Sequence, residues 1–259
     1  MLFTLSPAKK LDYESPVVVP RSTEPLFVEP ATELIAVLRR QSVAEIADLM
    51  KLSDALARLN AARYAEWEPE FPDDVARPAL LAFNGDVYEG LEARSLDSVG
   101  LEWAQEHVVI LSGLYGVLRP LDRMRPYRLE MGTRLKVGKA ANLYQFWNDR
   151  ITTYLNQRLA DQREPVVVNL ASEEYFKSVQ VAGLAAPVVQ CVFQDWKRDG
   201  YKIISFHAKR ARGLMARFAI DQQVDRVAGL RDFDREGYRY APEASAPDRL
   251  VFRRRQDEA

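Results

Sequence analysis

Four arginines on a short, stiff segment are the most chemically informative residues of this chain. Residues 111 to 132 contain three glycines, two prolines and two tyrosines together with Arg119, Arg123, Arg125 and Arg128. Glycine lets backbone approach a ligand closely, and proline restricts the backbone. The guanidinium group presents a planar set of donors that matches phosphate or carboxylate. This combination predicts a rigid surface that binds an anion.

A second group of cations lies on a predicted helix near residues 208 to 218. The spacing of Ala211, Leu214, Met215 and Phe218 predicts the buried face of this helix. The opposite face carries two small residues, Gly213 and Ala216, flanked by Lys209, Arg210, Arg212 and Arg217. We expect a shallow trough there that accepts a phosphate or carboxylate. A solvated basic helix is the alternative, although it lacks the glutamates that usually pair with such cations.

Two lysines and several other side chains are candidates for catalysis. Lys9 and Lys10 follow a predicted strand and a proline, where a lysine can bind phosphate or, when desolvated, act as a nucleophile. A surface lysine is the alternative. Glu130 lies among cations that would keep it ionised, as a general base or as the structural partner of an arginine. The candidates for acid, base or nucleophile are Lys9, Tyr88, Glu130 and Lys177.

Several standard chemistries have no support in the sequence. The histidines, His107 and His207, have no metal-ligand spacing, and there is no Cys-x-x-Cys motif, so we expect neither a metal site nor a cofactor. The phosphate-loop and dinucleotide-binding motifs are missing too. Ser112 does not lie in a nucleophile elbow and is interpreted as a turn residue. Whether the protein is an enzyme stays open, and these absences weigh against it.

The single cysteine and the N-terminus indicate the compartment. Cys191 has no partner for an internal disulfide, and its apolar neighbours predict a buried strand thiol rather than a peroxide-reactive one. The first ten residues place their lysines after the apolar residues, in the reverse order to a secretory signal. No stretch approaches the length of a membrane span. We therefore expect a cytoplasmic protein without membrane contact.

Charge is unevenly distributed along the chain although the net charge is only −1. Residues 24 to 106 contain 17 acidic and 7 basic residues, whereas residues 119 to 150 contain 8 basic and 3 acidic ones. Residues 197 to 217 contain 7 basic residues and 1 acidic residue. Such segregation can produce a local positive field. Solvated charged faces scattered by folding are the alternative.

Short apolar runs predict the sheet that would position these side chains. We expect strands at residues 1 to 5, 79 to 83, 108 to 111 and 166 to 170. The last three run directly into glycine-rich or polar loops. Because sites gather at the carboxyl ends of parallel strands, we expect these loops to converge. The pattern predicts a mixed α/β fold with a central, largely buried sheet and surrounding helices.

Three helices are predicted near the N-terminus, at about residues 31 to 39, from Ser42 and from Ser53. Ser42 and Glu45 form a capping-box pattern. The second and third helices are separated by a tight turn, as in a helix-hairpin-helix that holds phosphate on backbone amides. The usual glycines are absent and the segment is acidic, so a plain pair of core helices is the alternative.

Hairpins are predicted in the last third of the chain. Residues 187 to 196 and 201 to 206 flank an Asp-Gly turn, and residues 237 to 240 precede a strand at 250 to 252. A charged tail follows. Because no repeat, low-complexity tract or linker interrupts the sequence, we expect residues 1 to 259 to form a single interlocked domain.

The chain resembles the YaaA family of peroxide-stress proteins in motifs that span nearly its whole length. The matching motifs are residues 6–9 (SPAK), 83–88 (FNGDVY), 111–122 (LSGLYGVLRPLD), 126–132 (PYRLEMG), 143–147 (LYQFW), 169–178 (NLASEEYFKS) and 209–218 (KRARGLMARF). The resemblance implies a bacterial, cytoplasmic protein that is induced by hydrogen peroxide and limits free iron and oxidative damage. It also implies an unusual mixed α/β fold with a positively charged cleft, a helix-hairpin-helix-like element, and binding to DNA, including duplexes with unpaired regions.

Two functional hypotheses follow. The first is a monomeric stress protein that binds DNA, with Tyr115, Tyr127 and Tyr175 stacking on unpaired bases. Its cations would be Lys9, Lys10, Arg119, Arg123, Arg125, Arg128, Lys177, Lys209, Arg210, Arg212 and Arg217. The second is an enzyme that acts on a small anionic metabolite or nucleotide in the same cleft. An open groove favours DNA, and a deep closed pocket favours the enzyme. Direct iron chelation lacks the carboxylate and histidine cluster that hard-ligand sites use.

Overall fold

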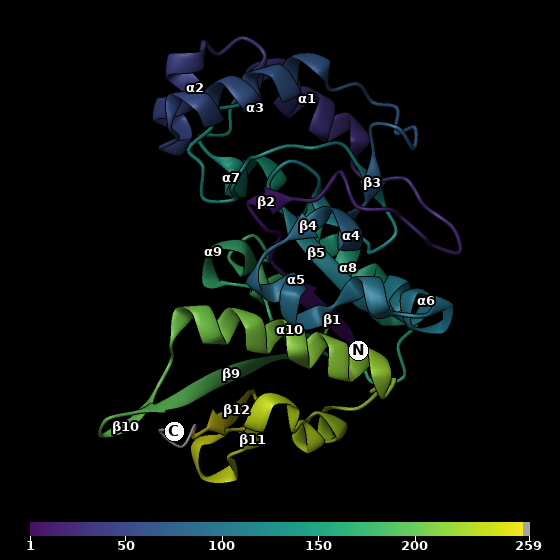
Figure 1. The fold of residues 1–259 in the computed structure, drawn as a ribbon, viewed down its shortest axis with the longest axis vertical. Helices are drawn as coiled ribbons and strands as arrows, with labels where there is room; N and C mark the ends of the chain where they lie inside the picture. The colour runs from purple at the N-terminus through teal and green to yellow at the C-terminus, as the bar shows by residue number, and fades with distance from the viewer. Residues whose placement is uncertain (256–259) are drawn as a thin grey trace.

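The structure of the protein is a computed structural model, and it describes residues 1–255. Figure 1 shows a sheet that crosses the lower half of the molecule and a layer of helices at the opposite end. The strand order is β11-β12-β9-β8-β1-β5-β6, with β10 paired to β9. The strands are β1 (Leu2–Leu5), β5 (Val108–Ser112), β6 (Gly116–Leu118), β8 (Val167–Asn169), β9 (Val188–Lys197), β10 (Gly200–Lys202), β11 (Arg239–Tyr240) and β12 (Arg249–Arg254).

The sheet is mostly parallel. β1 pairs in parallel with β5 and β8, and β9 pairs in parallel with β8 and β12. β6, β10 and β11 add antiparallel pairs. Every residue of β1, β5 and β8 is buried, which explains their continuous apolar sequences. The predicted strands at residues 1 to 5, 108 to 111 and 166 to 170 are confirmed, as is the mixed α/β class.

Helices and short strands surround this sheet. The helices are α1 (Val28–Leu38), α2 (Val43–Met50), α3 (Asp54–Glu66), α4 (Ala79–Ala82), α5 (Asp86–Leu91), α6 (Ser98–His107), α7 (Leu143–Trp147), α8 (Arg150–Ala160), α9 (Glu173–Phe176) and α10 (Ser205–Asp221). Two small ribbons pair β2 (Lys10–Leu11) with β4 (Phe83–Asn84) and β3 (Arg77–Pro78) with β7 (Arg123–Met124). Short 3-10 helices cover Ala93–Ser95, Val181–Gly183, Val227–Asp232, Arg235–Gly237 and Pro242–Ala244. None of the helices within residues 1–255 is long and apolar enough to cross a membrane.

The three N-terminal helices are confirmed, and they form the layer at the top of Figure 1. The hydroxyl of Ser42 accepts a hydrogen bond from the amide of Glu45, whose carboxylate accepts one from the amide of Ser42. Ser53 caps α3 by accepting from the amide of Leu56. Between the caps, Lys51 ends α2 at a φ of 53°. The α2–α3 pair buries Ile46, Met50, Ala57 and Tyr64, as core helices do.

Two expected strands differ from the structure. Residues 79 to 82 form the buried helix α4 instead of a strand, in agreement with the helix propensity of alanine and leucine. The hairpin at the Asp-Gly turn is confirmed, but β10 ends at Lys202 because α10 begins at Ser205. The last hairpin is confirmed as β11 and β12. The charged tail falls on residues 256–259, outside the described residues.

Helices α5 and α10 pack with their backbones in close contact. A Cβ atom on Gly213 would lie 1.8 Å from the carbonyl oxygen of Val87, and one on Gly90 would lie 2.2 Å from that of Arg210. The trough expected around Gly213 and Ala216 is therefore wrong, since α5 fills it and both residues are buried. Small residues on α10 serve the packing of two helices rather than a ligand.

Replacement of Gly213 by alanine should destabilise the protein. The added Cβ has no space against the α5 backbone, so we expect the free energy of unfolding to fall by about 1–3 kcal/mol in urea denaturation. Gly200→Ala is the matched control, because nothing lies within 4 Å of a Cβ there. A Gly213→Ala protein as stable as the control would contradict the close helix contact.

Candidate functional site

A cleft of about 540 Å³ lies at the carboxyl ends of the parallel strands. Ser6 follows β1, and Ser172 follows β8. Two of the three loops predicted to converge line this cleft, namely those after residues 79 to 83 and 166 to 170, whereas the loop directly after β5 does not. The lining residues are Ser6, Pro7, Ala8, Lys9, Lys10, Asn84, Gly85, Asp86, Val87, Tyr88, Glu89, Tyr127, Arg128, Leu129, Glu130, Ser172, Glu174, Tyr175, Lys209 and Arg212.

Hydrogen bonds tie the ends of β1 and β8 together beneath the cleft. The hydroxyl of Ser6 donates to that of Ser172 at 3.2 Å and accepts from the Ser172 amide at 2.8 Å. One strand position earlier, the Oδ1 atom of Asn169 accepts from Thr4 at 3.2 Å and from the amide of Ala171 at 2.9 Å. These contacts hold both loop starts in fixed positions.

Three tyrosines lie against the cleft and are mostly buried. The Tyr88 hydroxyl donates to the carbonyl oxygen of Ser6 at 3.0 Å, and the Tyr127 hydroxyl lies 2.6 Å from that of Ser112. Burial raises the pKa of Tyr88, Tyr127 and Tyr175 well above the usual value for a phenol. These phenols therefore stay protonated at neutral pH, where they act as hydrogen-bond donors and not as bases.

Glu130 joins two of the predicted cations. Its carboxylate lies 3.2 Å from the Lys9 ammonium and 3.1 Å from the Arg128 guanidinium. The expected pairing of Glu130 with an arginine is therefore confirmed. Both cations reach the cleft with part of their donor capacity used by this one carboxylate.

Helix α10 contributes two further cations, because α5 covers only its other flank. Lys209 lies 3.9 Å from the carboxylate of Asp86. Arg212 is half-buried against the cleft and has no carboxylate partner within residues 1–255. Burial lowers the pKa of the Arg212 guanidinium. An uncompensated cation in a cleft costs free energy, which makes it a marker of a binding site.

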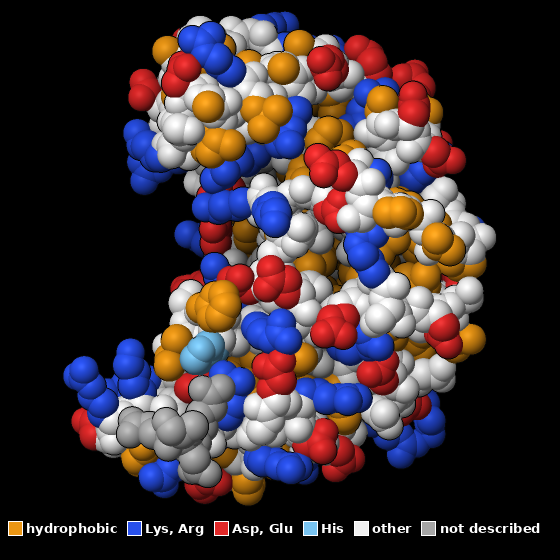
Figure 2. All heavy atoms as spheres, in the orientation of Figure 1, with side chains coloured by type: hydrophobic (Ala, Val, Ile, Leu, Met, Phe, Trp, Pro, Cys, Tyr) orange, Lys and Arg blue, Asp and Glu red, His pale blue; other side chains and the backbone are white. Residues whose placement is uncertain are grey.

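A second cleft of about 870 Å³ adjoins the first, and Lys10 and Asn84 line both. It lies between α3 and the segment after β2, and its lining includes Tyr13, Arg63, Trp67 and Arg125. Figure 2 shows the molecule hollowed on its left side, with lysine and arginine side chains gathered along the hollow. Arg125 donates to the carbonyl oxygens of Glu66 and Glu70.

Arg63 is a cleft residue that the sequence interpretation missed. Arg63 lies in a segment with many acidic residues, so the charge count of that segment did not indicate a cationic site. The available signal was its position on α3 beside the buried residues Asn60 and Tyr64. A cation on the margin of a buried helix face has part of its side chain out of water.

Four of the predicted arginines lie outside both clefts, and each is paired with a carboxylate. Arg123 pairs with Glu24 and Asp73, and Arg210 pairs with Glu236. Arg217 pairs with Asp221 and donates to the backbone at the end of α5. The structure does not bring these arginines to the site, because nearby carboxylates hold them.

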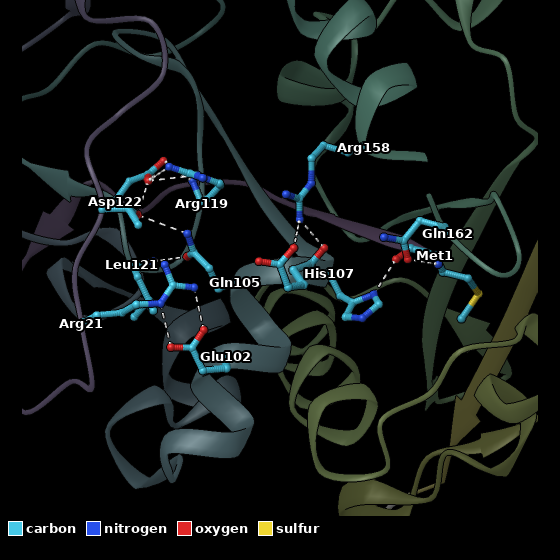
Figure 3. A network of polar contacts seen from close by, with 12 residues as sticks. Met1, Arg21, Glu102, Gln105, His107, Arg119, Leu121, Asp122, Arg158 and Gln162 are labelled. Atoms are coloured by element: carbon cyan, nitrogen blue, oxygen red, sulfur yellow. Dashed lines mark hydrogen bonds and ion pairs between the residues drawn. The ribbon is translucent and has the colours of Figure 1, made fainter. Parts of the chain in front are cut away.

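Arg119 is the fourth, and Figure 3 shows it against Asp122. The Asp122 carboxylate also accepts from Thr23, which in turn accepts from Gln105 of α6. Gln105 accepts from the amide of Leu121 at 2.7 Å. Arg119 is therefore part of a network that fixes its own loop, and it does not line either cleft.

Two other predicted contacts line neither cleft. Tyr115 is fully buried, and its hydroxyl accepts from the indole of Trp67 at 2.9 Å, so its ring has no free face for a base. Lys177 lies outside the cleft lining, with its ammonium 5.2 Å from the ring centre of Tyr144. Tyr127 is 4% exposed and Tyr175 is 8% exposed, so only a small part of each residue reaches the cleft.

Cys191 lies in β9 and is buried, as predicted. Burial raises the pKa of its thiol to about 12. In residues 1–255, no three side chains of histidine, cysteine, aspartate or glutamate lie close enough to hold a metal ion.

The mostly parallel sheet with helices around it, and a cleft at its carboxyl edge, define a mixed α/β protein. Over residues 1–244 the chain matches the family described as peroxide stress protein YaaA, and it belongs to this family. The family predicted from the motifs is thus confirmed, and a role in peroxide stress fits.

Relatives that match over nearly their whole length occur in several bacteria. A UPF0246 protein of Bordetella petrii is 64% identical over 255 residues, which cover 98% of this chain and all of the relative. A UPF0246 protein of Paracidovorax citrulli is 65% identical over 256 residues, which cover 98% of this chain and 99% of the relative. One of Leptothrix cholodnii is 61% identical over 254 residues, covering 98% of both chains.

Replacement of Arg212 by methionine should leave the protein as stable as before, or more stable. The change removes a half-buried cation that has no carboxylate partner and keeps the side-chain volume. Arg254→Met is the matched control, because Arg254 is buried 2.7 Å from the buried carboxylate of Asp195. We expect the control to lose about 3–5 kcal/mol in urea denaturation. An equal loss in both variants would show that Arg212 is structural.

The native protein should react slowly with thiol reagents and peroxide. The thiolate is the reactive form, and burial of Cys191 disfavours it. We expect an aromatic disulfide reagent to label Cys191 in minutes in denaturant and over hours in native buffer. Rapid oxidation of the native thiol by hydrogen peroxide, measured by mass spectrometry, would contradict this.

Proposed function

We propose that this protein acts in the cytoplasmic response to hydrogen peroxide by binding DNA along its two adjoining clefts, and that it limits free iron and oxidative damage. The family supports the stress role. The position and pairing of the cations support the DNA role. The iron-limiting role is supported by the family resemblance alone.

The observation that carries the DNA proposal is the set of unpaired cations along one open hollow. Lys10, Arg63 and Arg212 line the clefts, and none of them makes an ion pair with a carboxylate in residues 1–255. Three other arginines of the predicted binding set, Arg119, Arg210 and Arg217, are paired with carboxylates and line neither cleft. Phosphates spaced along a strand can supply the ion-pair partners that Lys10, Arg63 and Arg212 lack.

DNA binding also connects to oxidative damage by simple electrostatics. A protein that neutralises phosphates releases the cations condensed on them. Fe²⁺ is one such cation, and hydroxyl radicals formed at DNA-bound iron act where they arise. A bound DNA segment would therefore hold less iron and suffer less cleavage.

The second candidate is an enzyme for a small anionic substrate. It is favoured by the cluster of Lys9, Glu130 and Arg128 beside the Tyr88 phenol, and by the volume of the first cleft. A volume of about 540 Å³ lies within the usual range of small-ligand sites. Lys9 would then act as acid or base while Glu130 orients it.

DNA binding should weaken steeply as salt concentration rises. We expect fluorescence anisotropy with a labelled duplex that contains an unpaired loop to give a linear log–log plot. Lys10→Ala and Arg212→Ala should each reduce its slope by about one. Arg163→Ala is the control, because Arg163 pairs with Asp225 and precedes β8, at the opposite edge of the sheet.

A flat salt dependence would contradict the DNA proposal. Equal log–log slopes for the wild type, the two cleft variants and the control would contradict it as well. Saturable binding of a mononucleotide without binding of the duplex would favour the enzyme.

A further inference from the structure

Three cations meet where the two clefts join. Lys10 lines both clefts, Arg63 lines the larger, and Arg128 lines the smaller. Tyr64, the residue after Arg63 on α3, donates to the carbonyl oxygen of Arg128, so the two arginines lie near each other. They come from three separate parts of the chain: β2, α3 and the segment after β7. Folding therefore places like charges together at this junction.

Arg128 has an unsatisfied donor at the junction. Its side chain is 16% exposed, and its Nη2 atom donates to Glu130 at 3.1 Å. Its Nε atom is buried and has no hydrogen-bond acceptor in the described part of the chain. The backbone is held from the other side, where the Tyr64 hydroxyl donates to the Arg128 carbonyl oxygen. A buried donor without an acceptor costs free energy unless a ligand satisfies it.

Arg63 is in a similar situation. Burial is the main cause of its lowered pKa. Its guanidinium donates to the side chain of Asn60 at 3.3 Å, and no carboxylate in residues 1–255 pairs with it. Most of its donors are therefore free toward the cleft.

The carboxylates nearby do not balance these charges. Glu130 is shared between Arg128 and Lys9. The other acidic residues that line the larger cleft make no ion pair with Lys10, Arg63 or Arg128 across residues 1–255; they are Asp12, Glu14, Glu66 and Asp74. Asp12 is already paired with Arg94 at 2.8 Å. Lys10 and Arg63 therefore have no ion-pair partner in residues 1–255, although the larger cleft is lined by three cations and four carboxylates.

We propose that Lys10, Arg63 and Arg128 form a phosphate site, filled by an internal phosphodiester of a DNA strand that lies in both clefts. This inference rests on the proposed DNA binding. Two guanidinium groups can donate in pairs to phosphate oxygens, and Lys10 adds a mobile charge at the rim. The phosphate supplies a negative charge next to both arginines.

A strand fits this position better than a free phosphate ester. The site lies where the two clefts adjoin, since Lys10 lines both of them. Each cleft alone has the volume of a small-ligand site. A phosphate at their junction leaves one cleft on each side for the groups that an internal phosphodiester carries on both of its ester oxygens.

The test compares two arginines of α3. Arg63→Met removes a member of the site, whereas Arg58→Met removes an exposed arginine that pairs with Asp54. The probes are a dodecamer of thymidylate, its uncharged methylphosphonate analogue and thymidine monophosphate. We expect Arg63→Met to weaken dodecamer binding about tenfold, the loss of one charge-assisted contact. The Arg58→Met protein should bind the dodecamer as tightly as the wild type does. The uncharged analogue should bind neither to this variant nor to the wild type.

Other outcomes separate the possible failures. Equal dodecamer affinity in Arg63→Met and the wild type would overturn the phosphate site and leave DNA binding intact. An equal loss of thymidine monophosphate and dodecamer binding would assign the site to a small phosphate ester instead. Absence of dodecamer binding in the wild type would overturn the proposed function and the site with it. The urea midpoint of Arg63→Met should equal or exceed that of the wild type, and a large fall would show a structural role.

Discussion

The contact between α5 and α10 is the constraint on which the arrangement of the site depends. Two glycines let the helix backbones approach until no side chain separates them. α10 is therefore fixed in rotation, with Lys209 and Arg212 toward the cleft and Arg210 toward Glu236. The same contact places α5, with Asp86 and Tyr88, at the cleft margin. One packing interaction thus decides which cations of a basic helix reach the ligand side.

The arginines of this protein divide into two groups by their neighbours. Arg119 and Arg254 lie beside buried carboxylates and hold loops or strands in place. Arg63 and Arg212 make no ion pair with a carboxylate of residues 1–255. A paired arginine has little attraction left for a distant anion, because its field is cancelled at short range. Arg63 and Arg212 therefore keep more of their attraction for an anion than Arg119 and Arg254 do.

Much of the fold could be predicted from the sequence, because buried parallel strands and capped helices have strong local signals. The predicted strands at β1, β5 and β8 and the cap at Ser42 are examples. Residues 79 to 82 were assigned the wrong element, since a short apolar run fits a buried strand and a buried helix equally well. The site was harder to predict. Gly213 is buried by a helix distant in sequence, and Arg63 becomes a cleft residue only when α3 packs above β2 and β4.

The position of β12 in the sheet has a consequence for the order of synthesis. β12 lies between β9 and β11, and it follows β9 in the chain only after α10. During synthesis on a ribosome, β9 emerges before β12. Until β12 follows, the edge of β9 that pairs with β12 has no neighbouring strand. Open strand edges promote association between chains. The nascent protein therefore passes through a stage in which its longest strand is unprotected, and this stage ends when Arg254 reaches Asp195.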